Sequence, residues 1–370
     1  MDWSTIRSDF PVLGECVYLN TASASATPAA VAEAVEPFFE EKSRGYLSGG
    51  WNDQKDRCQR VIADHIGADP EEIVFVSNTT EAINLFAAAV DWTAGDEILI
   101  TEGNFPSNVY PWQFHTDETV AVRTVDVTAS DPPTAAIESA MSDRTRVVAV
   151  PHVSAKTGTR LDLDALGEIA TEYDARTFVD GIQAFGYRIP DVDGLDSYAA
   201  AAFKWLLGPF GVGIWYLDAA TAEELSPPMV GYGAVEGRGA YDTETYTFID
   251  GPQKFQYAHA NYPGIYCLEA CIEYLETIGF ERIRDRVREL TGGLYDGLAA
   301  MPAVSVHTPR DHRGAIITFE HASVDPETAV DRLADDDIHV AARGGRIRVS
   351  PHFYNNRTDI DAVLAGVESL

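Results

Sequence analysis

The sequence predicts an α/β fold in which a mainly parallel sheet is flanked by helices, followed by a smaller α+β C-terminal domain. Through the first two thirds of the chain, short apolar runs alternate with helical patterns, as they do where parallel strands are buried on both faces. The last third changes to longer helical patterns with isolated strands between them. A length of 370 residues is enough for two domains.

The individual elements follow from the apolar periods, taken in chain order. In the first part we expect strands at 73–76, 97–100, 146–150, 177–180 and 212–216, with helices at about 80–90 and 164–173. After an irregular stretch we expect helices at 262–278, 280–298 and near 326–335, strands near 304, at 315–319 and at 346–350, and a final helix. In parallel sheets ligands bind at the carboxyl ends of the strands, so the residues that follow these strands are the candidates for a site.

Composition and charge exclude several classes of function. The formal net charge of −31 argues against nucleic acid or an anionic membrane as a partner. Only 5 of the 27 basic residues are lysines, and no acidic tail explains the charge, so we expect a cytoplasmic protein of a halophilic organism. No signal peptide or membrane-spanning run is predicted. The four cysteines form no CxxC pair and are expected to be free thiols, and no metal site is predicted.

Lys204 is the most informative residue. It lies in an apolar, glycine-bounded stretch of a chain that has few lysines, and a desolvated lysine is the usual Schiff-base residue. Asp180 ends a predicted buried strand. A Schiff-base lysine and an aspartate are the pair that pyridoxal 5′-phosphate (PLP) requires, because the lysine holds the aldehyde and the carboxylate keeps the pyridine nitrogen protonated. The pair therefore predicts PLP as the cofactor.

A phosphate site is predicted where the strand at 73–76 meets the next helix. Asn78, Thr79 and Thr80 lie at this junction, and the N–H groups and partial positive charge of a helix N-terminus suit a phosphate. The alternative is an ordinary N-terminal capping box with Glu81. The presence of Lys204 and Asp180 favours the phosphate.

Four further residues follow or lie within predicted strands. Phe105 is expected to stack on a flat cofactor, the alternative being a loop aromatic that fills the rim of the core. His152 is a candidate cofactor contact, or a satisfied core histidine. Arg348 is expected to bind a substrate carboxylate, whereas Arg346 is interpreted as a surface arginine.

These residues together resemble the class V aminotransferase family of fold-type I PLP-dependent enzymes. This family includes cysteine desulfurases, selenocysteine lyases, isopenicillin N epimerase-like proteins and kynureninase. The similarity extends from 18–22 to 348–355 and rests on three segments: 78–84 (Asn-Thr-Thr-Glu-Ala-Ile-Asn), 179–183 (Val-Asp-Gly-Ile-Gln) and 204–209 (Lys-Trp-Leu-Leu-Gly-Pro). The resemblance implies an N-terminal segment at 1–18 that packs near the small domain, a large PLP-binding domain at 19–250 and a small domain at 251–370.

The resemblance also implies roles at the matching positions. Lys204 would carry the cofactor and move the proton at Cα, and Asp180 would pair with the pyridine nitrogen. Gln183 would bind the ring oxygen O3′, and residues 78–80 would hold the phosphate. Arg348 would bind the substrate α-carboxylate, with Asn20 and Ala22 near the substrate. The family is usually a homodimer with shared active sites, and His259 would approach the phosphate from the neighbouring subunit.

The predicted reaction is that of an aminotransferase acting on an amino acid or small amine, through an external aldimine and removal of the Cα proton by Lys204. The alternatives are a lyase that cleaves a C–S or Cβ–Cγ bond, and an epimerase. No cysteine follows Cys271, and Phe105 stands where desulfurases place a histidine. The sequence therefore predicts a member closer to the epimerase-like branch, and not a persulfide-forming cysteine desulfurase.

Overall fold

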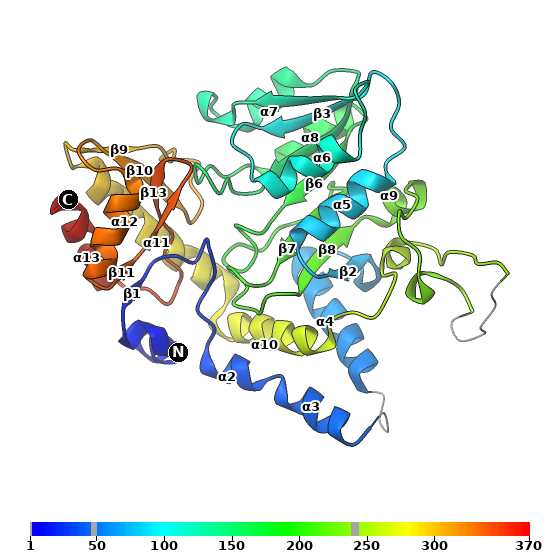
Figure 1. The fold of residues 1–370 in the computed structure, drawn as a ribbon, viewed down its shortest axis with the longest axis horizontal. Helices are drawn as coiled ribbons and strands as arrows, with labels where there is room; N and C mark the ends of the chain where they lie inside the picture. The colour runs from blue at the N-terminus through cyan, green and yellow to red at the C-terminus, as the bar shows by residue number, and fades with distance from the viewer. Residues whose placement is uncertain (1, 46–49, 238–243) are drawn as a thin grey trace.

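A seven-stranded sheet forms the centre of the computed structural model, which describes residues 2–45, 50–237 and 244–370. The strand order is β2-β8-β7-β6-β5-β3-β4, and β8 runs antiparallel to both of its neighbours while the other pairs are parallel (Figure 1). The strands are β2 (Ile73–Val76), β3 (Glu97–Thr101), β4 (Ala121–Val125), β5 (Thr145–Pro151), β6 (Arg176–Asp180), β7 (Ser197–Ala201) and β8 (Gly213–Leu217).

Helices cover both faces of this sheet because successive side chains of each buried strand point to opposite sides. In β6, for example, Phe178 packs in one apolar cluster and Val179 in the other. The cluster of Phe178 includes residues of α5 (Thr79–Ala89), α6 (Tyr110–Phe114) and α9 (Ala219–Glu224). The cluster of Val179 includes residues of α4 (Gly50–Ile66), α7 (Thr134–Ala140), α8 (Leu163–Glu172) and α10 (Tyr262–Ile278). The sheet is thus a buried layer with its strand ends free to build a site.

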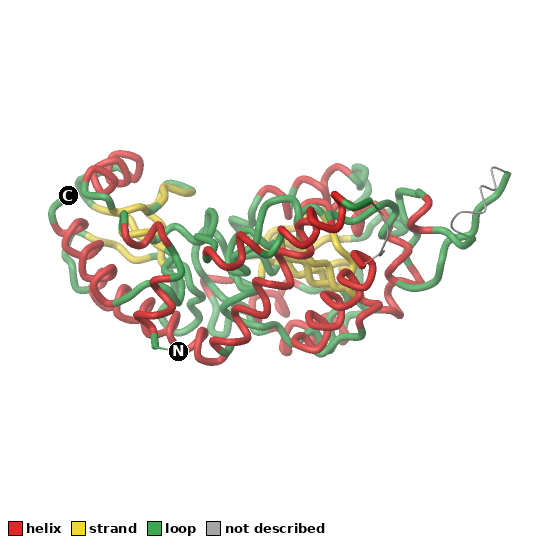
Figure 2. Tube along the Cα trace, turned by 90° about the horizontal axis from the view of Figure 1, so that it is seen from below, coloured by secondary structure: helices red, strands yellow, loops and turns green. Residues whose placement is uncertain are grey.

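A second, antiparallel sheet lies in the C-terminal part and has the order β12-β13-β10-β9. Figure 2 shows its strands as a group separate from the large sheet. The strands are β9 (Val304–Val306), β10 (Ile317–His321), β12 (Ala341–Arg343) and β13 (Arg346–Val349). Its own apolar cluster includes residues of α11 (Phe280–Ala299), α12 (Pro326–Asp335) and α13 (Arg357–Glu368).

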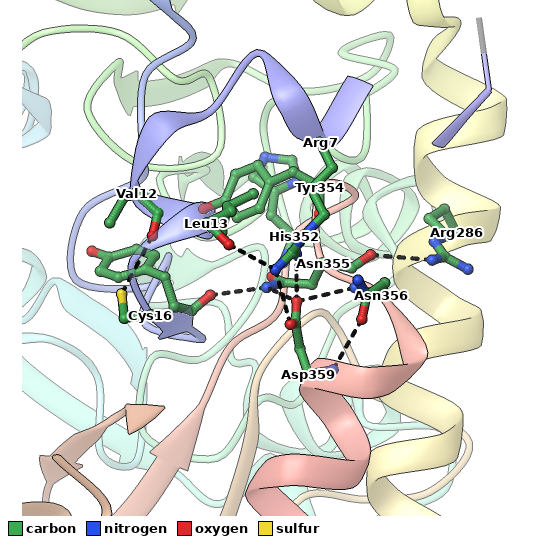
Figure 3. A network of polar contacts seen from close by, with 11 residues as sticks. Arg7, Val12, Leu13, Cys16, Arg286, His352, Tyr354, Asn355, Asn356 and Asp359 are labelled. Carbon is green, nitrogen blue, oxygen red and sulfur yellow. Dashed lines mark hydrogen bonds and ion pairs between the residues drawn. The ribbon is translucent and has the colours of Figure 1, made fainter. Parts of the chain in front are cut away.

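The N-terminal segment is fastened to the C-terminal part by a network of polar contacts (Figure 3). Arg7, in α1 (Trp3–Ser8), donates to the Asp359 carboxylate at 2.7 Å, and Asn355 donates to the Tyr18 carbonyl at 3.0 Å. β1 (Val17–Tyr18) pairs with β11 (Ile338–His339). The chain then continues through α2 (Ala29–Glu33) and α3 (Glu36–Ser43), which both contact α10.

The observed elements agree with most of the predicted ones. Five strands (β2, β3, β5, β6 and β8) and five helices (α5, α8, α10, α11 and α12) lie within one or two residues of their predicted bounds. The predicted final helix, for which the sequence gives no bounds, is α13. The strand predicted at 315–319 is displaced to Ile317–His321, and α4, β4 and β7 are among the elements that the sequence does not predict. No helix in the described part of the chain has the length and apolar character needed to cross a membrane.

Candidate active site

A cavity of about 280 Å³ lies where the carboxyl ends of β2, β6 and β7 meet. It brings together nine of the residues proposed from the sequence, although they come from distant parts of the chain. These residues are Ala22, Asn78, Thr79, Thr80, Phe105, Asp180, Gln183, Lys204 and Arg348. The strand order explains the convergence, because β2, β6 and β7 run in the same direction and end at the same edge.

Lys204 is buried, with 8% of its surface exposed, and its Nζ makes no hydrogen bond or ion pair with the described residues. The Nζ atom lies 5.8 Å from the centre of the Phe105 ring and 5.5 Å from that of Phe203. Burial lowers the pKa of Lys204 to about 8, and the nearby Arg348 adds to this effect while Asp180 opposes it. The amine is therefore a stronger candidate nucleophile near neutral pH than an exposed lysine.

Asp180 ends β6 at the floor of the cavity and is also buried. One of its oxygens accepts a hydrogen bond from the Ile182 N–H at 3.1 Å. Burial raises the pKa of Asp180 to about 6, although that N–H and the Lys204 charge act in the opposite direction. A protonated ring nitrogen would stabilise this carboxylate by a charge-assisted hydrogen bond, which is the role predicted from the sequence.

At the start of α5, Asn78 caps the helix, but Glu81 accepts from the Ser77 N–H and not from the Asn78 N–H, so the cap is not a full capping box. The phosphate site at this helix start stays a prediction. Asn78 is the N-cap, and its side chain accepts from the Glu81 N–H at 3.0 Å. The Thr79 hydroxyl accepts from the Ala201 N–H at 3.0 Å, which ties the helix start to the end of β7. The first N–H groups of a helix have no partner within it, so capping by Asn78 leaves donors that face the cavity.

Gln183 is held in place by two hydrogen bonds. Its Nε2 donates to the Ala22 carbonyl at 3.0 Å, and its Oε1 accepts from the Trp205 indole at 2.9 Å. An amide nitrogen carries two hydrogens, so one N–H of Gln183 is left to donate to a ligand oxygen such as O3′. Trp205 directly follows Lys204, so this contact also fixes the backbone beside the lysine.

Arg348, on β13, approaches the cavity from the second sheet and is 3% exposed. Its Nη2 donates to the Ser23 hydroxyl at 2.8 Å, while its Nε is buried without a hydrogen-bond partner among the described residues. Burial lowers the pKa of Arg348 to about 10, with Arg343 adding to the effect. An unsatisfied buried guanidinium is costly, and a carboxylate is the ligand that would satisfy it. Arg346 lies instead 3.6 Å from Glu320 in an ion pair.

Three residues predicted for the site do not line this cavity in the chain. His152 is buried, with its Nδ1 3.1 Å from the Tyr198 hydroxyl, and burial lowers its pKa to about 3. Asn20 forms a backbone bridge with Ser350 next to the cavity. His259 lines a separate cavity of about 80 Å³ and packs against Tyr232, so its predicted approach from a neighbouring subunit stays a prediction.

Three further polar residues line the cavity: Ser23, Ser107 and Arg343. The sequence assigns none of them a definite role. Ser23 directly follows Ala22, which the resemblance places near the substrate, and its contact with Arg348, 325 residues away, fixes it at the cavity. Arg343 ends β12, and the turn of Gly344 and Gly345 that follows has positive φ at both residues. That glycine pair is the sequence signal for a tight hairpin that brings Arg343 beside Arg348.

The four cysteines lie elsewhere. Cys58 and Cys271 are buried, Cys16 and Cys267 are half-buried, and none of them is among the described residues that line the Lys204 cavity. Burial raises the pKa of all four thiols above the ordinary value. The expectation of free thiols therefore agrees with the structure, and none of the four is placed as a nucleophile of this cavity.

The cavity fits PLP on the evidence of its own side chains. It offers an unpaired buried amine at Lys204, a buried carboxylate at Asp180 and the N-terminus of α5, each matching one chemical group of the cofactor. Phe105 is 52% exposed and faces the lysine, so its ring is available to stack on a flat ligand.

Comparison with known proteins finds relatives that match over the whole chain. A probable cysteine desulfurase from Methanothermobacter thermautotrophicus is 29% identical, covering 99% of this chain and 97% of the relative. A probable cysteine desulfurase from Halobacterium salinarum is 31% identical, covering 100% and 96%. A solved structure of a C-DES mutant, with glycine covalently linked to its PLP cofactor, has a TM-score of 0.90 at 22% identity, covering 98% of this chain and 99% of that one. The predicted fold is confirmed.

These comparisons correct the predicted reaction. Full-length relatives named cysteine desulfurases contradict both the aminotransferase prediction and the exclusion of a cysteine desulfurase. The placement closer to the epimerase-like branch finds no support. The error has a physical reason: Lys204, Asp180 and Arg348 would have the same predicted roles around Cα in each of the alternative reactions, whereas the exclusion depended on one missing thiol and on Phe105. The missing thiol concerns the group that accepts the sulfur, and Phe105 concerns the residue that stacks on the cofactor ring. Neither feature decides which bond of the substrate is broken.

The family itself is shown by a model of the aminotransferase class-V family, which matches residues 17–363. This match agrees with the resemblance drawn from the three sequence segments, and it confirms PLP as the cofactor. The chain belongs to the aminotransferase class-V family.

Proposed function

We propose that this protein uses PLP to cleave the Cβ–S bond of cysteine. The observation that carries the proposal is the Lys204 cavity, in which an unpaired buried amine lies together with a buried guanidinium whose Nε is unsatisfied. Full-length similarity to proteins named cysteine desulfurases supports sulfur removal as the outcome.

Each side chain of the cavity has a role in this proposal. Arg348 binds the substrate carboxylate through its free Nε, and the hydrogen bond to Ser23 keeps the guanidinium in place. Lys204 removes the Cα proton with its neutral amine, which the lowered pKa makes available near neutral pH. Asp180 holds the ring nitrogen protonated, and PLP, when bound, supplies the electron sink that acidifies the Cα proton.

The sulfur acceptor in the proposal is a thiol from a second substrate molecule, because none of the four cysteines lines the described cavity. Cysteine and a thiol RSH would give alanine and the persulfide RSSH. The sulfur forms an S–S bond with the thiol, the electron pair of the broken bond stays on Cβ, and Cβ gains a proton. Atoms and electrons balance without any further reactant.

The proposal includes a homodimer with shared active sites, which the contacts within a single described chain do not test. In such a dimer His259 of one subunit would approach the phosphate of the other. The half-buried Tyr262, which begins α10 next to His259, lies 6.1 Å from the His259 ring and would accompany it.

Incubation of the PLP-loaded enzyme with L-cysteine in concentrated potassium chloride, with and without dithiothreitol, tests the proposal. With dithiothreitol, equal amounts of alanine and sulfide are expected, because dithiothreitol reduces the persulfide. Without it, alanine and a persulfide of cysteine are expected, with no free sulfide. Lys204→Ala should abolish both products, whereas Arg346→Gln should retain them as a matched control. Pyruvate and ammonia in place of alanine would reveal β-elimination and contradict the sulfur-transfer step. Intact cysteine after long incubation would contradict the proposal as a whole.

A further inference from the structure

A second cavity, of about 350 Å³, has walls rich in arginine. Its arginines come from the loop after β5, the turn after β6, α11 and the loop before β10. We call it the arginine cavity and define it by Arg160, Arg188, Arg284, Arg288 and Arg313. Two aspartates, Asp285 and Asp311, also line it, so the lining carries three more positive than negative charges, in a chain whose net charge is −31.

Most of this positive charge has no partner within the described chain. Arg284 pairs with Asp285 at 3.1 Å. The side chains of Arg160, Arg188 and Arg288 make no ion pair or hydrogen bond with residues 2–45, 50–237 or 244–370. The chain has many more carboxylates than basic groups, yet the fold does not place enough of them in this cavity to neutralise its arginines.

Two guanidinium nitrogens in the cavity are buried and unsatisfied. The Nε atoms of Arg188 and Arg313 are inaccessible to solvent and have no hydrogen-bond partner among the described residues. Burial lowers the pKa of Arg188, and the positive charges of Arg160, Arg284 and Arg288 add to this effect, which places these charges close together. Buried donors and gathered like charges both raise the free energy of the empty cavity.

We propose that the arginine cavity binds a multivalent oxyanion of the phosphate or sulfate type. Guanidinium groups present planar pairs of donors that match the oxygens of such an anion, and several of them together favour a divalent charge over a monovalent one. The site is distinct from the Lys204 cavity, because the two have no lining residue in common. The proposal is independent of the reaction that the enzyme catalyses.

The position of the cavity gives the bound anion a structural effect. Tyr187 forms part of its wall, accepts a hydrogen bond from the Ala315 N–H at 3.1 Å, and lies 4.7 Å from the ring of Trp205, which follows Lys204. An anion held between α11, the 187–188 turn and the 311–314 loop would cross-link these segments behind the Lys204 backbone. Anion binding should therefore stabilise the folded enzyme.

Thermal unfolding of the PLP-loaded enzyme tests this site. The cofactor must be present because it fills the phosphate-binding start of α5. Sulfate and, separately, inorganic phosphate are titrated at a constant ionic strength set with potassium chloride. The proteins compared are the wild type, Arg188→Gln, Arg288→Gln and the control Arg146→Gln. Arg146 is a half-buried arginine at the start of β5, outside both cavities.

We expect a saturable rise in Tm for the wild type and for the control, with an apparent Kd about tenfold or more higher in the two cavity variants. Arg288 is exposed, so Arg288→Gln keeps the test decisive even if Arg188→Gln does not fold. An equal, non-saturating rise in all four proteins would reveal only the general stabilisation by these salts and would overturn the proposal. So would the absence of any rise, or saturation that neither cavity variant weakens.

Discussion

Replacement of Lys204 by methionine should stabilise the cofactor-free protein near neutral pH, although it removes the residue that anchors PLP. Burial lowers the pKa of Lys204 from 10.5 to about 8. Each unit of pKa difference between the folded and unfolded states corresponds to about 1.4 kcal/mol, so holding the charged lysine in the fold costs about 3 kcal/mol at pH 7. Methionine has a similar length and no charge, and it avoids this cost.

The pH dependence has a definite sign. The folded pKa lies below the unfolded one, so the cost is fully present below about pH 8 and disappears as the pH rises through 10.5. The gain in unfolding free energy should therefore decrease from at most about 3 kcal/mol at pH 7 to about 1 kcal/mol at pH 9.5. The positive charge of Lys204 also stabilises the ionised form of Asp180. Loss of that charge in the methionine variant therefore reduces the gain in unfolding free energy.

Urea unfolding of the apoprotein at pH 7 and pH 9.5 measures both values. Lys42→Met, at an exposed lysine, gives the baseline for the loss of one positive charge. A gain that is absent at pH 7, or one that grows toward pH 9.5, would refute the reasoning, because it would mean that the folded state does not disfavour the charged amine at position 204.

Three further predictions concern binding, stability and salt. Arg348→Gln should raise the KM for an amino acid about ten- to hundredfold in steady-state kinetics, because the substrate carboxylate loses a charged partner. Arg346→Gln should change the KM little, and equal effects of the two substitutions would contradict the assignment of Arg348 as the carboxylate-binding residue. Asp359→Ala should lower the free energy of unfolding by about 2 to 4 kcal/mol, because it removes the carboxylate that pairs with the Arg7 guanidinium in Figure 3. Asp361→Ala, which breaks an exposed ion pair, is the control and should lower it by less than about 1 kcal/mol. Similar losses for the two variants in urea unfolding would argue against the network. Dilution of potassium chloride from about 2 M to about 0.2 M should lower the Tm, because the repulsion within a chain of net charge −31 is then screened less. An unchanged Tm would contradict the interpretation of the charge as an adaptation to high salt.

Prediction of the fold succeeded where the sequence pattern was strong and failed where it was weak. β2, with the sequence Ile-Val-Phe-Val, has a continuous run of strand-forming apolar residues. β7 reads Ser-Tyr-Ala-Ala-Ala, and alanine is a poor strand former, so its central place in the sheet comes from its neighbours. The buried face of α4 includes Gln54 and Gln59 as well as apolar residues. Because two of its buried positions are polar, the helical repeat of apolar residues is weak in the sequence, and α4 was not predicted.

The sequence by itself determined the chemistry that is available: a lysine in an apolar stretch, an aspartate at a strand end and a polar helix start, which together specify PLP. Tertiary structure alone decided which charges meet. Ser23 reaches Arg348 across 325 residues, and the arginine cavity gathers side chains from four separate segments. The physical reason is that local patterns report burial and hydrogen bonding within a few residues, whereas the distance between remote side chains depends on strand order and on the packing of the two sheets.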